Sequence, residues 1–175
     1  MVKVGKFLIA RPTIEIGFFT KSVVFIYQSD STGASGFCLN KTSSFWTRDL
    51  ALQIGHDYPL RTDPVYLGGP VNERSVNLLH SDDFVSTNTL HTSTGIDVSS
   101  DLLMIEKIVT GNRPKYFRFI AGTSVWAPGQ LEFEIQKKYW LTADLTLDTV
   151  FELDSDQQWE AAIDQVSQQL VQRYF

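Results

Sequence analysis

The sequence is poor in cysteine and in long apolar runs, and each shortage excludes a class of protein. Cys38 is the single cysteine among 175 residues, so the chain cannot form an intramolecular disulfide. A lone cysteine suits a reducing compartment. No stretch approaches the roughly 18 consecutive apolar residues of a membrane span, and the first apolar run is too short for a secretory signal. We therefore expect a cytoplasmic protein with no membrane partner.

Clustered positive charge and metal-ligand spacing are also missing. The net charge is −5 at pH 7, and lysine and arginine nowhere form a run. Non-specific nucleic-acid binding depends on clustered cations that neutralise phosphates, so direct nucleic-acid binding is disfavoured. The histidines His56, His80 and His91 are scattered along the chain. They have no spacing typical of a metal site, and we expect neither a metal nor a cofactor.

The composition is that of a folded domain. Apolar residues make up 43% and aromatic residues 13% of the sequence, which predicts a bulky core. The length suits one domain over residues 1–175.

Short apolar and β-branched segments dominate the first two thirds of the chain and predict strands. They lie at residues 6–10, 22–28, 34–41, 65–67, 76–80 and 115–122, with shorter β segments within 89–99. Strands and helices do not alternate as they do in a doubly wound sheet. The pattern indicates an α+β fold.

Helical spacing predicts helices at 47–55, 100–110 and 155–175. Ser99 or Ser100 is expected to cap the second of these, and Ser155 and Gln158 have the spacing of a capping box for the last. The apolar face of this last helix consists of Trp159, Ala162, Ile163, Val166 and Leu170. Residues 128–140 fit both the two-residue period of a strand and the pattern of a helix. Early glutamates and late lysines favour the helix, because they complement its dipole.

Six segments in this order resemble the AlgH family, also called the YqgE/AlgH family of uncharacterised bacterial proteins. They read GKFLIARP, FFTKSVVFI, GASGFCLNK, VYLGGPV, WAPGQLEFEI and YWL, and the resemblance extends from Gly5 to the final helix. It implies an α+β fold in which a bent, mostly antiparallel sheet forms a small barrel-like core covered by helices. The family carries the label of a transcriptional regulator, and its biochemical activity is unknown.

The segment VYLGGPVNERSVNLLHS raises two catalytic possibilities that its pattern disfavours. A phosphate loop needs converging backbone amides at a helix start, whereas Gly68 and Gly69 follow a strand and Pro70 lacks an amide. These residues predict a turn. His80 and Ser81 are neighbours on a strand, so their side chains point to opposite faces and form no nucleophile–base pair.

The remaining candidate residues lie at strand ends and at one helix start. Cys38 sits between apolar residues, which predicts a buried and unreactive thiol. Asn40 either completes a turn or contacts a ligand at the mouth of the sheet. An exposed Trp126 beside Gln130 would form a binding surface with Gly129 and Glu132, whereas a buried Trp126 would only anchor the turn.

Two functions follow from these residues. The first is a non-enzymatic regulatory or protein-interaction protein that uses a surface groove near Gly69, Trp126 and Gln130. The alternative is a small-molecule-binding protein or enzyme with a site at the sheet mouth near Asn40 and Gly68. The second function requires a hollow with convergent polar groups and a residue of perturbed pKa.

Overall fold

The computed structural model describes residues 1–15, 17–57 and 63–175, and these form an α+β fold around one curled sheet. The strands are β1 (Phe7–Ala10), β2 (Val23–Asp30), β3 (Gly33–Cys38), β4 (Thr42–Trp46), β5 (Pro64–Leu67), β6 (Val71–Ser81), β7 (Thr89–Leu90), β8 (Ile96–Ser99), β9 (Phe117–Trp126) and β10 (Trp140–Ala143). The helices are the 3₁₀ turn η1 (Gly17–Phe19), α1 (Thr47–Gln53), α2 (Leu103–Val109), α3 (Gln130–Gln136), α4 (Leu147–Phe151) and α5 (Ser155–Tyr174).

The sheet is mostly antiparallel, as the family resemblance implies. Its main path runs β10-β1-β2-β3-β9-β6-β8-β7, and β4 pairs with β5, which in turn joins β9. Within the described residues, the pairing of β5 with β9 is the parallel exception. The predicted bent, mostly antiparallel sheet is therefore confirmed.

The first two strands are buried on both faces, which explains their continuous apolar runs. Along β1, Phe7 and Ile9 face the cluster beneath α5, whereas Leu8 and Ala10 face the cluster beside α3. This alternation follows from the two-residue period of a strand. Helices therefore cover both sides of β1 and β2.

Strand β9 is shared by the two halves of the sheet. Its first half pairs with β6 and β5, and its end pairs with β3 through Ser124, Val125 and Trp126. Between these partners lies Gly122, with a φ of +74° that favours glycine. A Cβ atom on Gly122 would lie 2.4 Å from the carbonyl oxygen of Gly69. The residue thus combines a bend with a close backbone contact.

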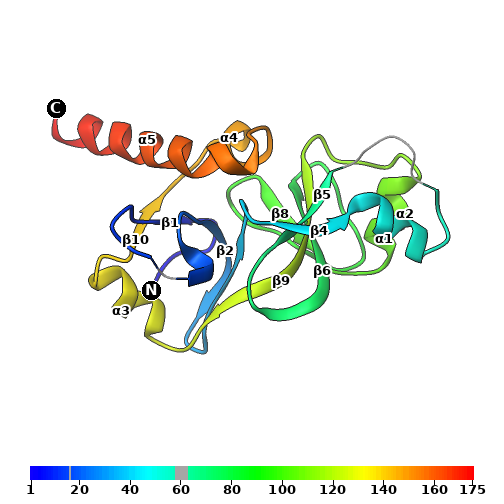
Figure 1. The fold of residues 1–175 in the computed structure, drawn as a ribbon, viewed down its shortest axis with the longest axis horizontal. Coiled ribbons are helices and arrows are strands. Elements are labelled where there is room, and N and C mark those ends of the chain that lie inside the picture. The colour runs from blue at the N-terminus through cyan, green and yellow to red at the C-terminus, as the bar shows by residue number, and fades with distance from the viewer. Residues whose placement is uncertain (16, 58–62) are drawn as a thin grey trace.

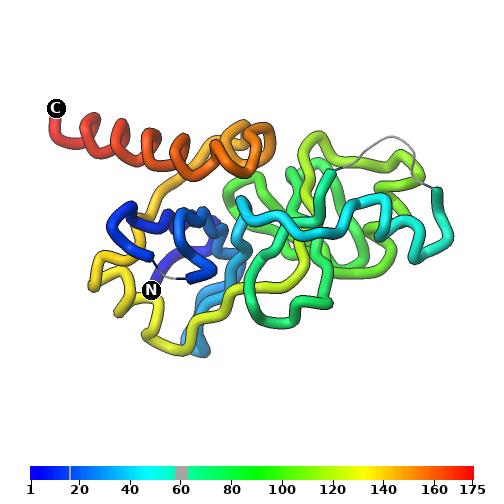
Figure 2. The backbone as a smooth tube through the Cα atoms, in the orientation of Figure 1, coloured from blue at the N-terminus to red at the C-terminus, as the bar shows by residue number. Residues whose placement is uncertain are grey.

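Figure 1 shows the two halves side by side. One contains β1, β2, β10, α3 and α5, and the other contains β4 to β8 with α1 and α2. Both chain termini lie in the first half (Figure 2). In the described ranges, no helix combines the length and the apolar composition that a membrane crossing requires.

The ambiguous segment 128–140 contains a helix and the start of a strand. α3 covers Gln130–Gln136, as predicted, but the chain then turns and Trp140 begins β10. Lys138 has a φ of +62° between these two elements. The predicted helix was too long, because the chain turns after Gln136 and Trp140 already belongs to β10.

The predicted helix caps are wrong, because the residue at the N-cap of α2 is Leu102, not Ser99 or Ser100, and the residue at the N-cap of α5 is Asp154. Ser99 lies in β8, where its hydroxyl contacts His80, and α2 begins only at Leu103. Ser155 is the first residue of α5, so it forms no capping box with Gln158.

Helix α5 packs on the sheet through only part of its predicted apolar face. Ala162 and Val166 are buried and Trp159 and Ile163 are half-buried. Leu170 is 45% exposed and lines an open hollow beside β10. The prediction that Leu170 packs inward is therefore wrong.

A buried arginine joins the two sides of the fold. Arg118 on β9 donates to the carbonyl oxygens of Leu39 (2.9 Å) and Leu153 (3.0 Å) and to Oε1 of Gln158 (3.1 Å). Its guanidinium also lies 4.4 Å from the ring centroid of Tyr66. Arg118 thereby connects the centre of the sheet to the end of β3 and to the start of α5.

Replacing Arg118 by lysine should lower the free energy of unfolding by about 3 kcal/mol, because a single ammonium group cannot donate hydrogen bonds to all of these separated acceptors. Urea unfolding followed by circular dichroism measures this change. The exposed Arg74 is the matched control, and Arg74→Lys should shift stability by at most about 0.5 kcal/mol. Equal unfolding midpoints for the two variants would contradict the role assigned to Arg118.

Candidate functional site

The Gly68–Gly69 pair forms the turn between β5 and β6 and allows a close approach of β9. The carbonyl oxygen of Gly68 accepts from the Cys38 amide and from the Ser124 hydroxyl, both at 2.8 Å. A Cβ atom on Gly69 would lie 2.3 Å from the Ser124 nitrogen. The backbone of β9 therefore packs directly against Gly69, and the predicted turn is confirmed.

Trp126 is buried and anchors α3, which is the packing alternative that the sequence left open. Only 3% of its surface is exposed. Its indole nitrogen donates to Glu134 Oε2 at 2.9 Å, and the Trp140 indole donates to the same oxygen at 2.8 Å. The expectation of an exposed Trp126 in a surface groove is therefore wrong.

The other residues of that predicted surface have separate roles. Gln130 accepts from the Ala127 amide and donates to Glu134 Oε1, both at 3.0 Å. Gly129 precedes α3 with a φ of +78°. Gly129 and Glu132 line a hollow of about 260 Å³, together with Asp30.

Asn40 occupies the sheet mouth and lines a hollow of about 330 Å³. Its Nδ2 donates to the carbonyl oxygen of Lys21 at 2.8 Å, and its Oδ1 accepts from the Val23 amide at 2.9 Å. The Asn40 side chain thus links the start of β2 to the end of β3. Of the two residues predicted for this site, Asn40 faces the hollow and Gly68 belongs to the turn beside β9.

Cys38 is buried directly behind Asn40. Its sulfur lies 3.6 Å from Asn40 Oδ1, and burial raises the pKa of the thiol to about 11. A nucleophilic cysteine requires the thiolate, which is scarce at neutral pH with this pKa. The structure agrees with the predicted unreactive thiol.

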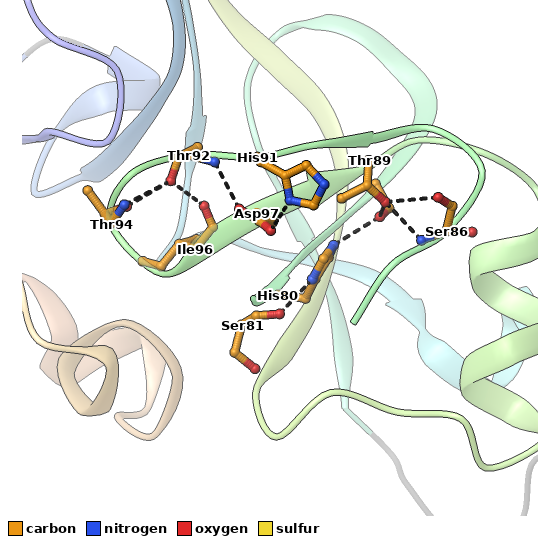
Figure 3. A network of polar contacts seen from close by, with 10 residues as sticks. His80, Ser81, Ser86, Thr89, His91, Thr92, Thr94, Ile96 and Asp97 are labelled. Atoms are coloured by element: carbon orange, nitrogen blue, oxygen red, sulfur yellow. Dashed lines mark hydrogen bonds and ion pairs between the residues drawn. The ribbon is translucent and has the colours of Figure 1, made fainter. Parts of the chain in front are cut away.

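A polar network that the sequence did not predict lies beneath the short strand β7 (Figure 3). His80 Nδ1 lies 2.8 Å from the Ser81 carbonyl oxygen and Nε2 lies 2.9 Å from Ser99 Oγ. Because a carbonyl oxygen only accepts, Nδ1 carries the proton and Nε2 accepts from Ser99. Ser99 Oγ also contacts Thr89 Oγ1 at 2.7 Å.

The His80–Ser99 contact has the arrangement of a base and a nucleophile, but it is closed to substrate. Both residues have 0% exposure. Burial lowers the pKa of His80, which keeps the imidazole neutral. The pair therefore holds β6, β8 and β7 together. Antiparallel pairing of β6 with β8 brings His80 close to residue 99, and sequence spacing alone gave no signal for this contact.

A second histidine contacts a buried carboxylate at the surface beside this network (Figure 3). His91 Nδ1 lies 2.7 Å from Asp97 Oδ2, and the Thr92 amide donates to Asp97 Oδ1 at 2.9 Å. Asp97 is buried, whereas the His91 side chain is 63% exposed. The pair fixes the loop between β7 and β8. No group of three or more metal-ligating side chains occurs among the described residues.

An exposed apolar segment was also missed by the sequence interpretation. Phe45 is 58% and Trp46 is 47% exposed, although both belong to β4. Neighbouring strand residues face opposite sides, so β4 is open on both faces. Leu52 and Ile54 follow at the end of α1 and are also exposed. The adjacent aromatic residues in the SSFW sequence were the available signal.

The neutral, buried His80 predicts that stability falls in acid. Its folded pKa lies below the unfolded value of about 6.5, so the unfolded chain binds a proton that the folded chain does not. The stability that comes from this pKa difference is fully present above about pH 6.5, and it is lost as the pH falls towards the lowered pKa of folded His80. Thermal unfolding between about pH 7.5 and about pH 5 should show this fall. His80→Gln should reduce the slope of the unfolding temperature against pH, and His56→Gln should preserve it. An unchanged slope in His80→Gln would show that His80 does not cause the loss of stability in acid.

The raised pKa of Cys38 predicts slow alkylation of the folded protein. At about pH 8, iodoacetamide should label native Cys38 at least about 100-fold more slowly than the chain unfolded in guanidinium. Mass spectrometry of timed samples measures both rates, and Cys38→Ser controls for other sites of modification. Equally fast labelling of folded and unfolded protein would show that the thiol is accessible and ionised.

Comparison with known proteins identifies a family and several relatives to which the chain is similar. The AlgH-like family model matches residues 7–171. A UPF0301 protein of Marinomonas sp. (strain MWYL1) is 35% identical over 159 residues, which cover 89% of this chain and 85% of the relative. A UPF0301 protein of Methylococcus capsulatus is 31% identical over 161 residues, covering 91% and 88% of the two chains.

A solved structure has the same fold. The solution structure of the AlgH protein from Pseudomonas aeruginosa matches with a TM-score of 0.78 and 25% identity, covering 93% of this chain and 87% of that one. With the matched family model and the similar relatives, this result shows that the chain belongs to the AlgH-like family.

Proposed function

We propose that the protein acts without catalysis, as a regulatory protein that binds a protein partner through residues 45–54. The observation that carries this proposal is the exposure of Phe45 and Trp46 on an open strand, followed by exposed Leu52 and Ile54. Exposed apolar side chains gathered in one segment are typical of interaction sites. Aromatic anchors often supply most of the binding energy in such sites.

The chemistry of the buried side chains supports a non-enzymatic function. The Cys38 thiol has a raised pKa, and the His80–Ser99 pair is closed to solvent. Neither group is available to a substrate in this conformation. The segment 45–54, in contrast, is available to a partner without rearrangement.

The chemistry of the chain also favours a protein over a nucleic acid as the partner. The net charge of −5 disfavours attraction to a phosphate backbone. A reduced thiol suits the cytoplasm, where we expect the partner. Regulation would then operate through protein contact, not through direct DNA binding.

A photo-cross-linking amino acid at position 45 should capture a partner in living bacterial cells, and the captured protein can be identified by mass spectrometry. The control places the same amino acid at Val125, which is 50% exposed on β9. Position 125 should not capture this partner. Identical products from both positions would contradict the proposed surface.

With the purified partner, Phe45→Ser combined with Trp46→Ser should weaken binding by at least about 30-fold, the loss typical of interface hot spots. Val125→Ser should leave the dissociation constant unchanged. Thermal unfolding should show that both variants remain folded, because exposed substitutions change stability by about 0.5 kcal/mol or less. Unweakened binding by the double variant would overturn the proposal.

A further inference from the structure

A charged hollow lies where the sheet mouth faces the first turns of α5. It has a volume of about 330 Å³, and Lys21 and Lys41 line it from the sheet side. Asp156 and Glu160 line it from α5. These carboxylates are four residues apart, so they share one face of the helix. The hollow therefore has a positive wall and a negative wall.

The two walls do not neutralise each other. Among the described residues, the ion pairs join Lys6 to Asp144 and the Met1 amino group to Glu132, and the contact of His91 with Asp97 also lies elsewhere, so none crosses this hollow.

The two lysines have other contacts on the sheet side. Lys41 Nζ donates to the Thr20 carbonyl oxygen at 2.7 Å, and Lys21 Nζ lies 5.5 Å from the ring centroid of Trp159. Both cations thus remain near the positive wall, and none of the described residues supplies a cationic partner to the α5 carboxylates that face the hollow. A ligand with charges of both signs would pair with both walls.

The uncharged part of the lining is held in place. Asn40 is fixed by hydrogen bonds at both ends of its amide, to Lys21 and Val23. The Trp159 indole donates to the carbonyl oxygen of Ala10 at 2.8 Å, which orients the half-buried ring. A site whose side chains are already ordered loses less conformational entropy when it binds.

We propose that this hollow binds a zwitterion that carries a carboxylate and an ammonium group, such as an amino acid or a short peptide. The carboxylate pairs with Lys21 and Lys41, and the ammonium group pairs with Asp156 and Glu160. An apolar portion of the ligand rests against Trp159. The volume lies near the lower end of the range for small-ligand pockets, about 300–1,000 Å³. This proposal is independent of the partner surface, because it uses none of residues 45–54.

Two-dimensional ¹H–¹⁵N spectroscopy of the full chain tests the site. Each common L-amino acid is added up to about 10 mM, which detects dissociation constants near 1 mM. Binding should shift the amide signals of Lys21 and Asn40 and the indole signal of Trp159. The N-acetylated and the amidated forms of each binding amino acid should bind at least about tenfold more weakly, because each lacks one charge.

Glu160→Gln should weaken binding of the same amino acid at least about tenfold. Glu106→Gln is the matched control, since Glu106 is an exposed glutamate on α2, and it should leave affinity unchanged. Phe45→Ser with Trp46→Ser should also bind normally, which separates this site from the partner surface. The spectra themselves verify that each variant is folded.

Three outcomes would overturn the proposal. The first is that no amino acid shifts these signals over the full titration. The second is that the blocked analogues bind as well as the free amino acids, which would make charge of both signs unnecessary. The third is that Glu160→Gln and Glu106→Gln bind equally well.

Discussion

The hydrogen bonds of one buried guanidinium hold the helical layer to the sheet. Arg118 is 5% exposed, and its acceptors come from the end of β3, from the loop before α5 and from α5 itself. Burial lowers the pKa of this guanidinium, while the charges of Asp63 and Asp154 favour its charged form. Neutral carbonyl oxygens and the face of Tyr66 supply its close contacts. A buried cation tolerates this environment only when its donors have partners.

Gln158 extends this arrangement into the helices. Its Oε1 accepts from Arg118, and its Nε2 donates to the carbonyl oxygens of Thr149 and Val150, both at 2.9 Å. One fully buried amide thus connects the end of α4, the first turn of α5 and the central strand. The charged hollow lies beside this junction, so its helix wall is held at a fixed distance from its sheet wall.

The sequence predicts those features that depend on local periodicity. Short apolar and β-branched runs predicted strands, and the apolar neighbours of Cys38 predicted its burial. Features that depend on partners distant in the chain could not be predicted. The His80–Ser99 contact arises from the register of β6 and β8, and the exposure of Phe45 depends on which strands leave β4 uncovered. Trp126 has the same local sequence in both alternatives, and packing against Phe19 and Trp140 makes it buried.

The pairing of β1 with β10 has a consequence for the order in which the fold can form. Phe7 lies opposite Ala143, so the first strand leaves the ribosome long before its outer neighbour is made. The first half of β3 likewise waits for Ser124 to Trp126. Until then the β1-β2-β3 meander has two open edges and two apolar faces, a state that is prone to aggregation. Such distant pairings slow folding, and the nascent chain depends on the last third of its own sequence for protection.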